Sequence, residues 1–256
     1  MPIVARLNVT PVKSTALLHP EQIRLEPHGA VGNRDFFVVD KDGKRFSGAK
    51  KAQLLRIGSD YDFERDRLVL RLPGGVVAAG SAAANGEALS VRFYGRDVQG
   101  HVVEGGFEEA LTRYTGEPVR LVRVDHPGTG VDVRPVTIVS LASVDELSRW
   151  GGVESRVDPG RFRMLLEIDG CAPHEEDTWS GRRVRIGGAT VEVGRQVPRC
   201  ATTTLSPTTG LRDFPTLSVI RKYRGVTADN NLPFGVYADV VEPGMVRVGD
   251  IVEPTT

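Results

Sequence analysis

The residue best suited to chemistry is Cys200, in the stretch GRQVPRCATTTLSPTTG at 194–210. A deprotonated thiol is a strong nucleophile and a soft ligand for transition metals. An alternating apolar pattern predicts a strand before it, and Pro198 marks a strand edge or bulge because proline cannot donate to a strand ladder. Cys200 is therefore expected at a strand break, where a side chain can be aimed at a cavity. The alternative is a small buried hydrophobic residue, the role expected of Cys171.

A run of hydroxyl side chains follows the cysteine. Its members are Thr202, Thr203, Thr204, Ser206 and Thr208. Such hydroxyls can satisfy the backbone groups of a loop or line a polar pocket. Arg199, next to the cysteine, is expected to point to the opposite face of an extended chain, so it is not expected to be the direct counter-ion.

The elements that must position this thiol are mostly strands. Short runs of alternating apolar residues, separated by Gly, Asp and Pro, predict a barrel or sandwich. The predicted strands lie within 3–12, 34–46, 67–75, 89–103, 119–124, 161–169, 182–188, 190–197, 234–241 and 245–254. The runs 34–46 and 89–103 favour hairpins, because Asp42-Gly43 and Gly95 tolerate the backbone of a tight turn.

Two helices are predicted. The segment 107–116 places its apolar residues on one face and ends at Gly116, a plausible C-cap. The segment 143–152 begins with Ser143 and has Glu146 three residues later, the pattern of a capping box. The acidic residues of EEDTW at 175–179 are expected to be structural, capping or pairing with the basic strand RRVR.

Composition bounds the class of protein. Lys plus Arg and Asp plus Glu each number 33, so no net charge favours nucleic acid or an anionic membrane as a partner. The two cysteines form no CxxC pair, which disfavours a disulfide framework and a Cys-rich zinc or iron–sulfur site. No apolar run is long enough to predict a membrane span, and no secretory signal is evident, so a cytoplasmic location is expected.

Several segments together resemble a known family. VDPGRFRMLLEIDGCAPHEEDTWSGRRVRIGG, VPRCATTTLSPTTG and LPFGVYADVVEPGMVRVGD resemble the MOSC domain, the C-terminal domain type of molybdenum cofactor sulfurases. Upstream, LNVTPVKS and GAVGNRDFFVVDKDGKRFSGAKKAQLL resemble the β-barrel domain that precedes MOSC in the mitochondrial amidoxime-reducing component and its bacterial relatives.

This resemblance implies a fold and a domain division. The expected fold is mainly β (α+β), with an N-terminal β-barrel-like domain at 1–125 and a C-terminal MOSC β-barrel domain with a few helices at 126–256. The Gly- and Pro-rich segment HPGTGVDVRP at 126–135 is expected to link the two domains.

The resemblance also implies a site. The family binds molybdenum cofactor, a molybdopterin, with one cysteine thiolate as the protein's metal ligand, and the matching residue is Cys200. The residues that match cofactor-contacting positions, together with that ligand, are Lys13, Ser14, Arg34, Asp132, Arg134, Arg163, Pro198, Cys200 and Tyr237. The chain departs from the family pattern at Leu165, where the family has Asn, and at Pro198, where it often has Ser.

The resemblance implies an oxidoreductase that reduces small N-oxygenated compounds such as amidoximes. With only two cysteines the chain cannot ligate a four-cysteine iron–sulfur cluster, so a separate ferredoxin, flavoprotein or cytochrome donor is expected. The alternative is a cofactor carrier or sulfur-transfer protein that uses Cys200 without turnover. The aminotransferase-like sulfurase domain is not found here, so no pyridoxal phosphate is expected. A third hypothesis is a cysteine hydrolase that pairs Cys200 with His174 or His101.

Overall fold

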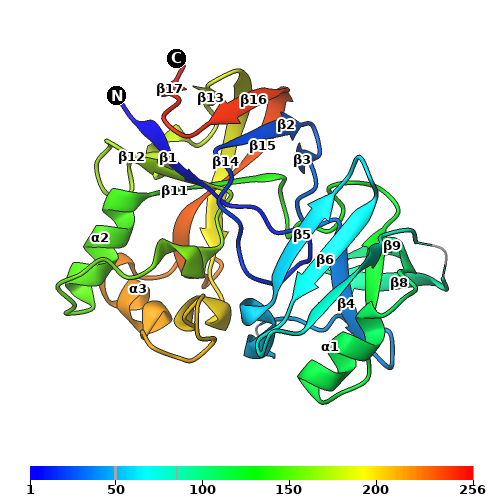
Figure 1. Ribbon diagram of the computed structural model, residues 1–256. Helices are drawn as coiled ribbons and strands as arrows, with labels where there is room; N and C mark the ends of the chain where they lie inside the picture. The colour runs from blue at the N-terminus through cyan, green and yellow to red at the C-terminus, as the bar shows by residue number, and fades with distance from the viewer. Residues whose placement is uncertain (49–50, 85, 256) are drawn as a thin grey trace.

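The computed structural model describes residues 1–48, 51–84 and 86–255, and within them it shows mostly strands with three α-helices. This confirms the predicted mainly β class. Two β-rich halves lie side by side, and both chain termini lie on the half that contains β11–β17 (Figure 1). In the segment GAKKAQLL, residues 49 and 50 lie outside the described part of the chain.

The C-terminal half is built on a seven-stranded sheet in the order β1-β12-β11-β15-β14-β13-β17. Its strands are β1 (Ile3–Leu7), β11 (Val136–Ser140), β12 (Leu166–Asp169), β13 (Arg183–Ile186), β14 (Ala189–Pro198), β15 (Pro233–Glu242) and β17 (Val252–Pro254). All described pairs are antiparallel except β11 with β12. Buried Val, Leu and Ile side chains from these strands pack around Trp179 to form its core.

The first strands of the chain pair with strands from its end. Strand β1 is antiparallel to β12, and β2 (Gln22–Glu26) lies between β3 (Gly29–Ala30) and β16 (Gly244–Arg247). The chain then crosses to the N-terminal half, so its two halves are joined by more than the segment 126–135. A domain division at 125/126 remains a prediction.

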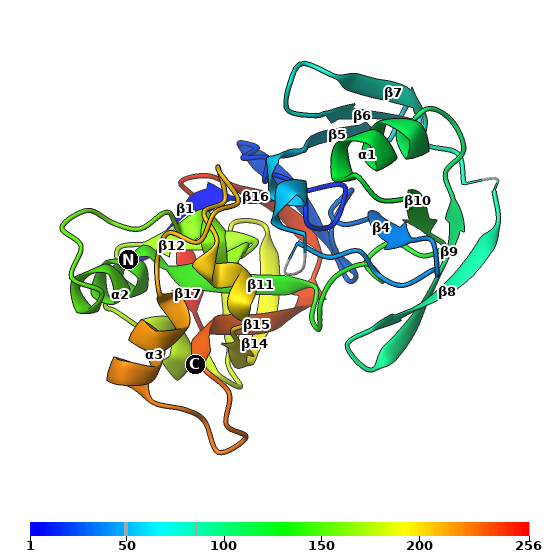
Figure 2. The ribbon, with the colours of Figure 1, turned by 90° about the horizontal axis from the view of Figure 1, so that it is seen from below.

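The N-terminal half holds two further sheets. One has the order β4-β10-β9-β8 and the other β5-β6-β7. The strands are β4 (Phe36–Asp40), β5 (Gly58–Asp62), β6 (Arg67–Arg71), β7 (Val77–Ser81), β8 (Ala88–Phe93), β9 (Arg96–Val102) and β10 (Val119–Val124). Helix α1 (Phe107–Thr115) contacts β10 and β7, as Figure 2 shows, and the 3₁₀ turn η1 spans Ala52–Arg56. Buried apolar residues between these elements form the second core.

The helix predictions were right for one helix and partly right for another. Helix α1 ends as predicted at Gly116, which adopts the left-handed conformation (φ 73°). Helix α2 spans Leu141–Trp150, but the predicted capping box at Ser143 is wrong. Strand β11 runs directly into the helix, so Ser140 is the N-cap and its hydroxyl accepts a hydrogen bond from the Ser143 amide. Helix α3 (Thr216–Arg224) was not predicted.

Two strand predictions need correction. The segment 161–169 is a strand only from Leu166, because Pro159–Phe162 forms the 3₁₀ turn η2 and Arg163 has a positive φ of 53° that no strand allows. The segment 245–254 is two short strands, β16 and β17, separated by a turn at Gly249 (φ 87°).

The two hairpin predictions had different outcomes. The predicted hairpin in 89–103 is β8–β9, with Tyr94 and Gly95 as its two-residue turn. In 34–46 only β4 is a strand, and its return arm makes a single bridge between Val39 and Arg45.

None of the helices in the described ranges is long and apolar enough to cross a membrane.

Candidate functional site

Cys200 lies where β14 ends. Pro198 is the last residue of that strand, and Cys200 precedes the 3₁₀ turn η4 (Ala201–Thr204) with an extended backbone (φ −119°, ψ 177°). Its side chain is exposed and forms no disulfide. The Sγ atom lies 3.5 Å from the Thr202 hydroxyl. The prediction of a thiol at a strand break is therefore confirmed.

The hydroxyl run serves the loop backbone more than a pocket. The hydroxyls of Thr203 and Thr204 donate to the carbonyls of Cys200 (3.0 Å) and Ala201 (2.7 Å). Within this turn only the Thr202 hydroxyl is directed at the thiol.

Two arginines, Arg199 and the buried Arg161, hold the cysteine loop, and sequence reasoning assigned a role to neither. Arg199 donates from Nε to the Phe234 carbonyl (2.8 Å) and from Nη1 to the Phe162 carbonyl (3.1 Å), and burial lowers its pKa to about 10. Arg161, only 4% exposed, donates to the Thr203 carbonyl at 3.1 Å. The sequence carries no signal for these contacts, because the carbonyls that accept from the two arginines lie far away along the chain.

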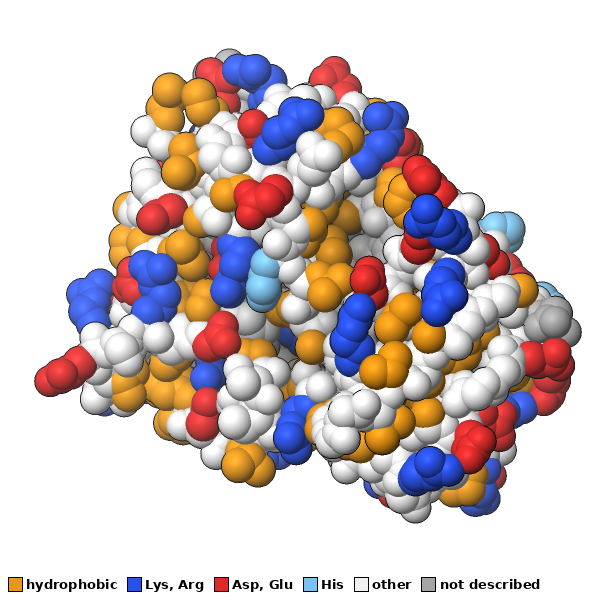
Figure 3. Space-filling model, viewed as in Figure 1, with side chains coloured by type: hydrophobic (Ala, Val, Ile, Leu, Met, Phe, Trp, Pro, Cys, Tyr) orange, Lys and Arg blue, Asp and Glu red, His pale blue; other side chains and the backbone are white. Residues whose placement is uncertain are grey.

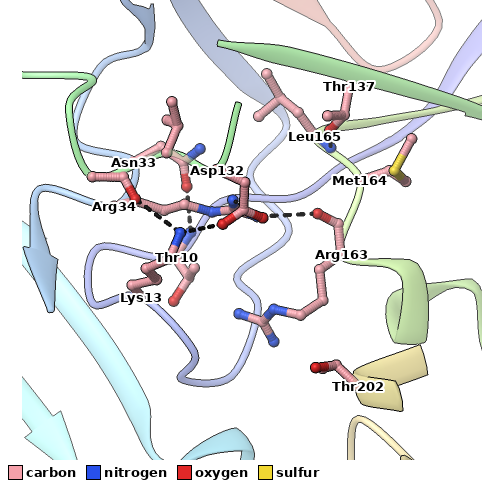
Figure 4. A network of polar contacts seen from close by, with 12 residues as sticks. Thr10, Lys13, Asn33, Arg34, Asp132, Thr137, Arg163, Met164, Leu165 and Thr202 are labelled. Atoms are coloured by element: carbon pink, nitrogen blue, oxygen red, sulfur yellow. Dashed lines mark hydrogen bonds and ion pairs between the residues drawn. The ribbon is translucent and has the colours of Figure 1, made fainter. Parts of the chain in front are cut away.

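A cluster of cations surrounds one carboxylate between the two halves. Lys13 Nζ forms an ion pair with Asp132 and donates to the Gly130 carbonyl (2.9 Å). Arg34 Nη1 lies 3.1 Å from the other Asp132 oxygen. Figure 4 shows Lys13 and Arg34 directed at Asp132 from the N-terminal segment. Burial raises the pKa of Asp132, but the charges of Lys13 and Arg34 outweigh it and hold this pKa well below its usual range.

Lys13 is buried in this cluster, with 7% of the residue exposed. Burial is the main cause that lowers the pKa of Lys13 to about 7. The Asp132 charge opposes this shift, whereas the charges of Arg34 and Arg45 add to it. Positive charge is therefore crowded here beyond what one carboxylate can neutralise.

Arg163, in the connection between η2 and β12, also lies at the cluster around Asp132. Its Nη2 donates to the Thr15 carbonyl (2.7 Å), and its own carbonyl accepts from Arg34 Nη2 (3.3 Å). Figure 4 shows its side chain directed to the side of the site where Thr202 lies. Burial, followed by the charge of Arg34, lowers the pKa of Arg163 to about 9.

The other predicted residues have different surroundings. Ser14 adjoins Lys13 in a turn with φ 73°. Arg134 is more than half exposed and pairs with Asp239 (3.2 Å), and it lines a small pocket together with Arg34 and Arg163. Leu165, at the family's Asn position, lines the same pocket.

Tyr237 and Pro198 lie on the cysteine side. Tyr237 is 5% exposed on β15, and its pKa is raised by burial and by the charge of Asp132. Pro198 pairs with Pro233 and lines a different pocket together with Arg195 and Asp229.

The Cys200 thiol lies near the cations around Asp132. Asp132 and Cys200 both lie close enough to Tyr94 to act on it electrostatically. Both charges likewise act on Arg199. Figure 3 shows a hollow between the two halves, where residues of both halves, among them Leu55 and Pro207, line a groove.

No histidine forms a catalytic pair with the thiol in the described ranges. His174 bonds to Tyr223 (3.0 Å) and Arg224 (2.8 Å), and burial lowers its pKa to about 3. His101 bonds to Asp125 (2.8 Å). Nor do three His, Cys, Asp or Glu side chains gather as a metal site among the described residues.

Comparison with known proteins agrees with this architecture. The MOSC domain profile matches residues 125–253, and the MOSC N-terminal beta barrel domain profile matches residues 1–118. The mitochondrial amidoxime reducing component 2 of Bos taurus is 27% identical over 251 residues, covering 87% of this chain and 73% of the relative. The molybdenum cofactor sulfurase of Caenorhabditis elegans is 27% identical over 248 residues, covering 92% of this chain but 33% of that protein.

Among solved structures, the YUAD protein from Bacillus subtilis superposes with a TM-score of 0.46 at 15% identity, over 99% of this chain and 96% of that one. The two profiles together span almost the whole chain in the order of its two halves. The chain belongs to the MOSC family, with a MOSC N-terminal β-barrel domain preceding the MOSC domain.

Proposed function

We propose that this protein binds molybdenum cofactor, with the Cys200 thiolate as ligand to molybdenum, and reduces small N-oxygenated compounds of the amidoxime type. The observation that carries the proposal is an exposed thiol close to a group of cations, Lys13, Arg34 and Arg163, gathered around Asp132. The relatives named as amidoxime reducing components support the reaction class.

The residues present fit such a cofactor. A soft thiolate suits a sulfur-rich molybdenum centre, and Arg and Lys side chains suit a phosphate. Lys13, Arg34 and Arg163 bring three cations against the single carboxylate of Asp132, so an anion would complete the charge balance. A lone thiol leaves the remaining metal ligands to be supplied by the cofactor itself.

The chain's own residues would hold and orient the cofactor. The cofactor supplies the two-electron redox chemistry when bound. Arg199 and Arg161 fix the backbone on both sides of Cys200, so the sulfur is presented from a rigid loop. Lys13, Arg34 and Arg163 would bind the anionic end of the cofactor, with Ser14, Arg134, Pro198 and Tyr237 as further proposed contacts. Electrons would come from a separate donor, a ferredoxin, flavoprotein or cytochrome, and a cytoplasmic location stays a prediction.

The alternative is a carrier or sulfur-transfer protein that uses Cys200 without redox turnover. Two observations favour keeping it: the thiol is solvent-exposed, and sulfurases are among the relatives. The two functions differ in turnover and not in cofactor binding.

The test is elemental analysis of protein produced in cells that make the cofactor, followed by benzamidoxime reduction with a chemical electron donor. We expect molybdenum near one per chain in the wild type and a loss in Cys200→Ser, with Cys171→Ala as the matched control. Reduction of benzamidoxime supports the oxidoreductase. Bound molybdenum without turnover supports the carrier, and equal molybdenum in Cys200→Ser contradicts both.

A further inference from the structure

Arg45 lies near the cations around Asp132 and has an unused donor. It lies on the return arm of the β4 hairpin, bridged to Val39. Its Nη1 atom is buried and has no hydrogen-bond partner within the described ranges. Buried polar atoms are almost always paired, so a buried guanidinium nitrogen without a partner indicates a missing acceptor.

An aromatic surface holds the guanidinium of Arg45 in place. Its central carbon lies 4.6 Å from the ring centre of Tyr94 and 5.0 Å from that of Phe93. Tyr94 occupies the turn between β8 and β9 with a positive φ of 43°, a conformation that is costly for a bulky residue, and it is 56% exposed. Stacking of this kind restricts an arginine side chain and leaves Nη1 without a partner.

The surroundings favour an anion as the missing acceptor. Arg45 adds a fourth cation to Lys13, Arg34 and Arg163, and the described part of this cluster offers them one carboxylate, Asp132. Asp132 is already shared by Lys13 and Arg34. A water molecule could accept from Nη1, but it would leave the excess positive charge in place.

We infer that Arg45 is an anion-binding residue of this cluster, which donates from Nη1 to an oxyanion of the phosphate-ester class, and that Tyr94 positions it. The inference rests on the cation cluster of the proposed function and names an additional residue for the anionic end of the cofactor. Arg45 and Tyr94 both come from the N-terminal domain, so that domain would contribute binding as well as support.

The test measures sulfate binding to the cofactor-free full-length chain by isothermal titration calorimetry at constant ionic strength. Sulfate is a stand-in for a phosphate-ester dianion and does not titrate near neutral pH. Arg45→Met should weaken sulfate binding about tenfold, since one charge-assisted hydrogen bond is lost. Arg92→Met is the matched control, because Arg92 lies on β8 close to Tyr94, is exposed and pairs with Asp97.

Variants at Tyr94 test its positioning role and remain informative if Arg45→Met does not fold. Tyr94→Phe should keep wild-type affinity because the stacking surface remains, whereas Tyr94→Leu should weaken sulfate binding several-fold. Cofactor-loaded Arg45→Met should also retain less molybdenum and less pterin per chain than Arg92→Met.

The inference is overturned if the wild type binds no sulfate, if Arg45→Met binds it as tightly as the wild type, or if Tyr94→Leu matches Tyr94→Phe. Failure of the proposed function would look different. Sulfate binding would still depend on Arg45, but the purified protein would hold no molybdenum or reduce no N-oxygenated compound.

Discussion

The buried amine of Lys13 predicts how stability depends on pH. Its pKa is about 7 in the folded protein and 10.5 for an ordinary lysine, mainly because of burial. Between these values the unfolded chain binds a proton that the folded chain does not, so stability rises as the pH increases through this window. Each pKa unit corresponds to about 1.4 kcal/mol, and integration from pH 7 to pH 9 gives a gain of about 2 kcal/mol from this group.

Lys13→Met removes this titration and isolates its contribution. Urea unfolding of both proteins at pH 7 and pH 9 should show a wild-type free energy of unfolding that rises by about 2 kcal/mol more than that of the variant. In the wild type the charges of Lys13 and Arg34 hold the pKa of Asp132 low, and Arg34 remains beside Asp132 in the variant. Sulfate should reduce the difference, because a bound anion raises the pKa of Lys13. Parallel pH profiles for the two proteins would refute the reasoning.

Three further predictions concern other residues. Burial raises the pKa of Glu176 to about 7, so the free energy of unfolding should fall by about 3 kcal/mol as the pH rises from 4.5 to 8. Urea unfolding of Glu176→Gln should not show this pH dependence. The amide oxygen of the variant can still accept from Ser140 and Ser143. Arg161→Met should cost about 3 kcal/mol of unfolding free energy, because the Thr203 carbonyl and Asp213 lose a buried partner; a loss below 1 kcal/mol would contradict this anchoring role. Cys171→Ala should leave molybdenum content unchanged by elemental analysis, and a loss would reveal a second ligand.

Local patterns predicted most strands because alternation and turn residues act over short distances. The β8–β9 hairpin and the C-cap of α1 depend on Gly95 and Gly116, whose conformational freedom is a property of the residue itself. Helix α3 was missed, and its apolar face is buried against β15 only after the sheet has formed.

The partners of the acidic residues in EEDTW also could not be predicted from local sequence. The acidic residues of EEDTW were expected to cap or pair with the basic strand, and the pairing with that strand is wrong. Glu176 accepts from Ser140 and Ser143, and Asp177 forms an ion pair with Arg224 on α3. These partners come from elements far apart in sequence, so no spacing rule could have found them.

The sequence alone was enough for the fold class, the strand break at Cys200 and the family, because these follow from short-range pattern and from motifs in a fixed order. Only the tertiary structure decided which cations meet. Lys13 and Arg34 reach Asp132 across about a hundred residues of chain, and Arg45 joins them through contacts with an aromatic turn. Burial and mutual repulsion, which set the charge state of this cluster, arise when the two halves pack together.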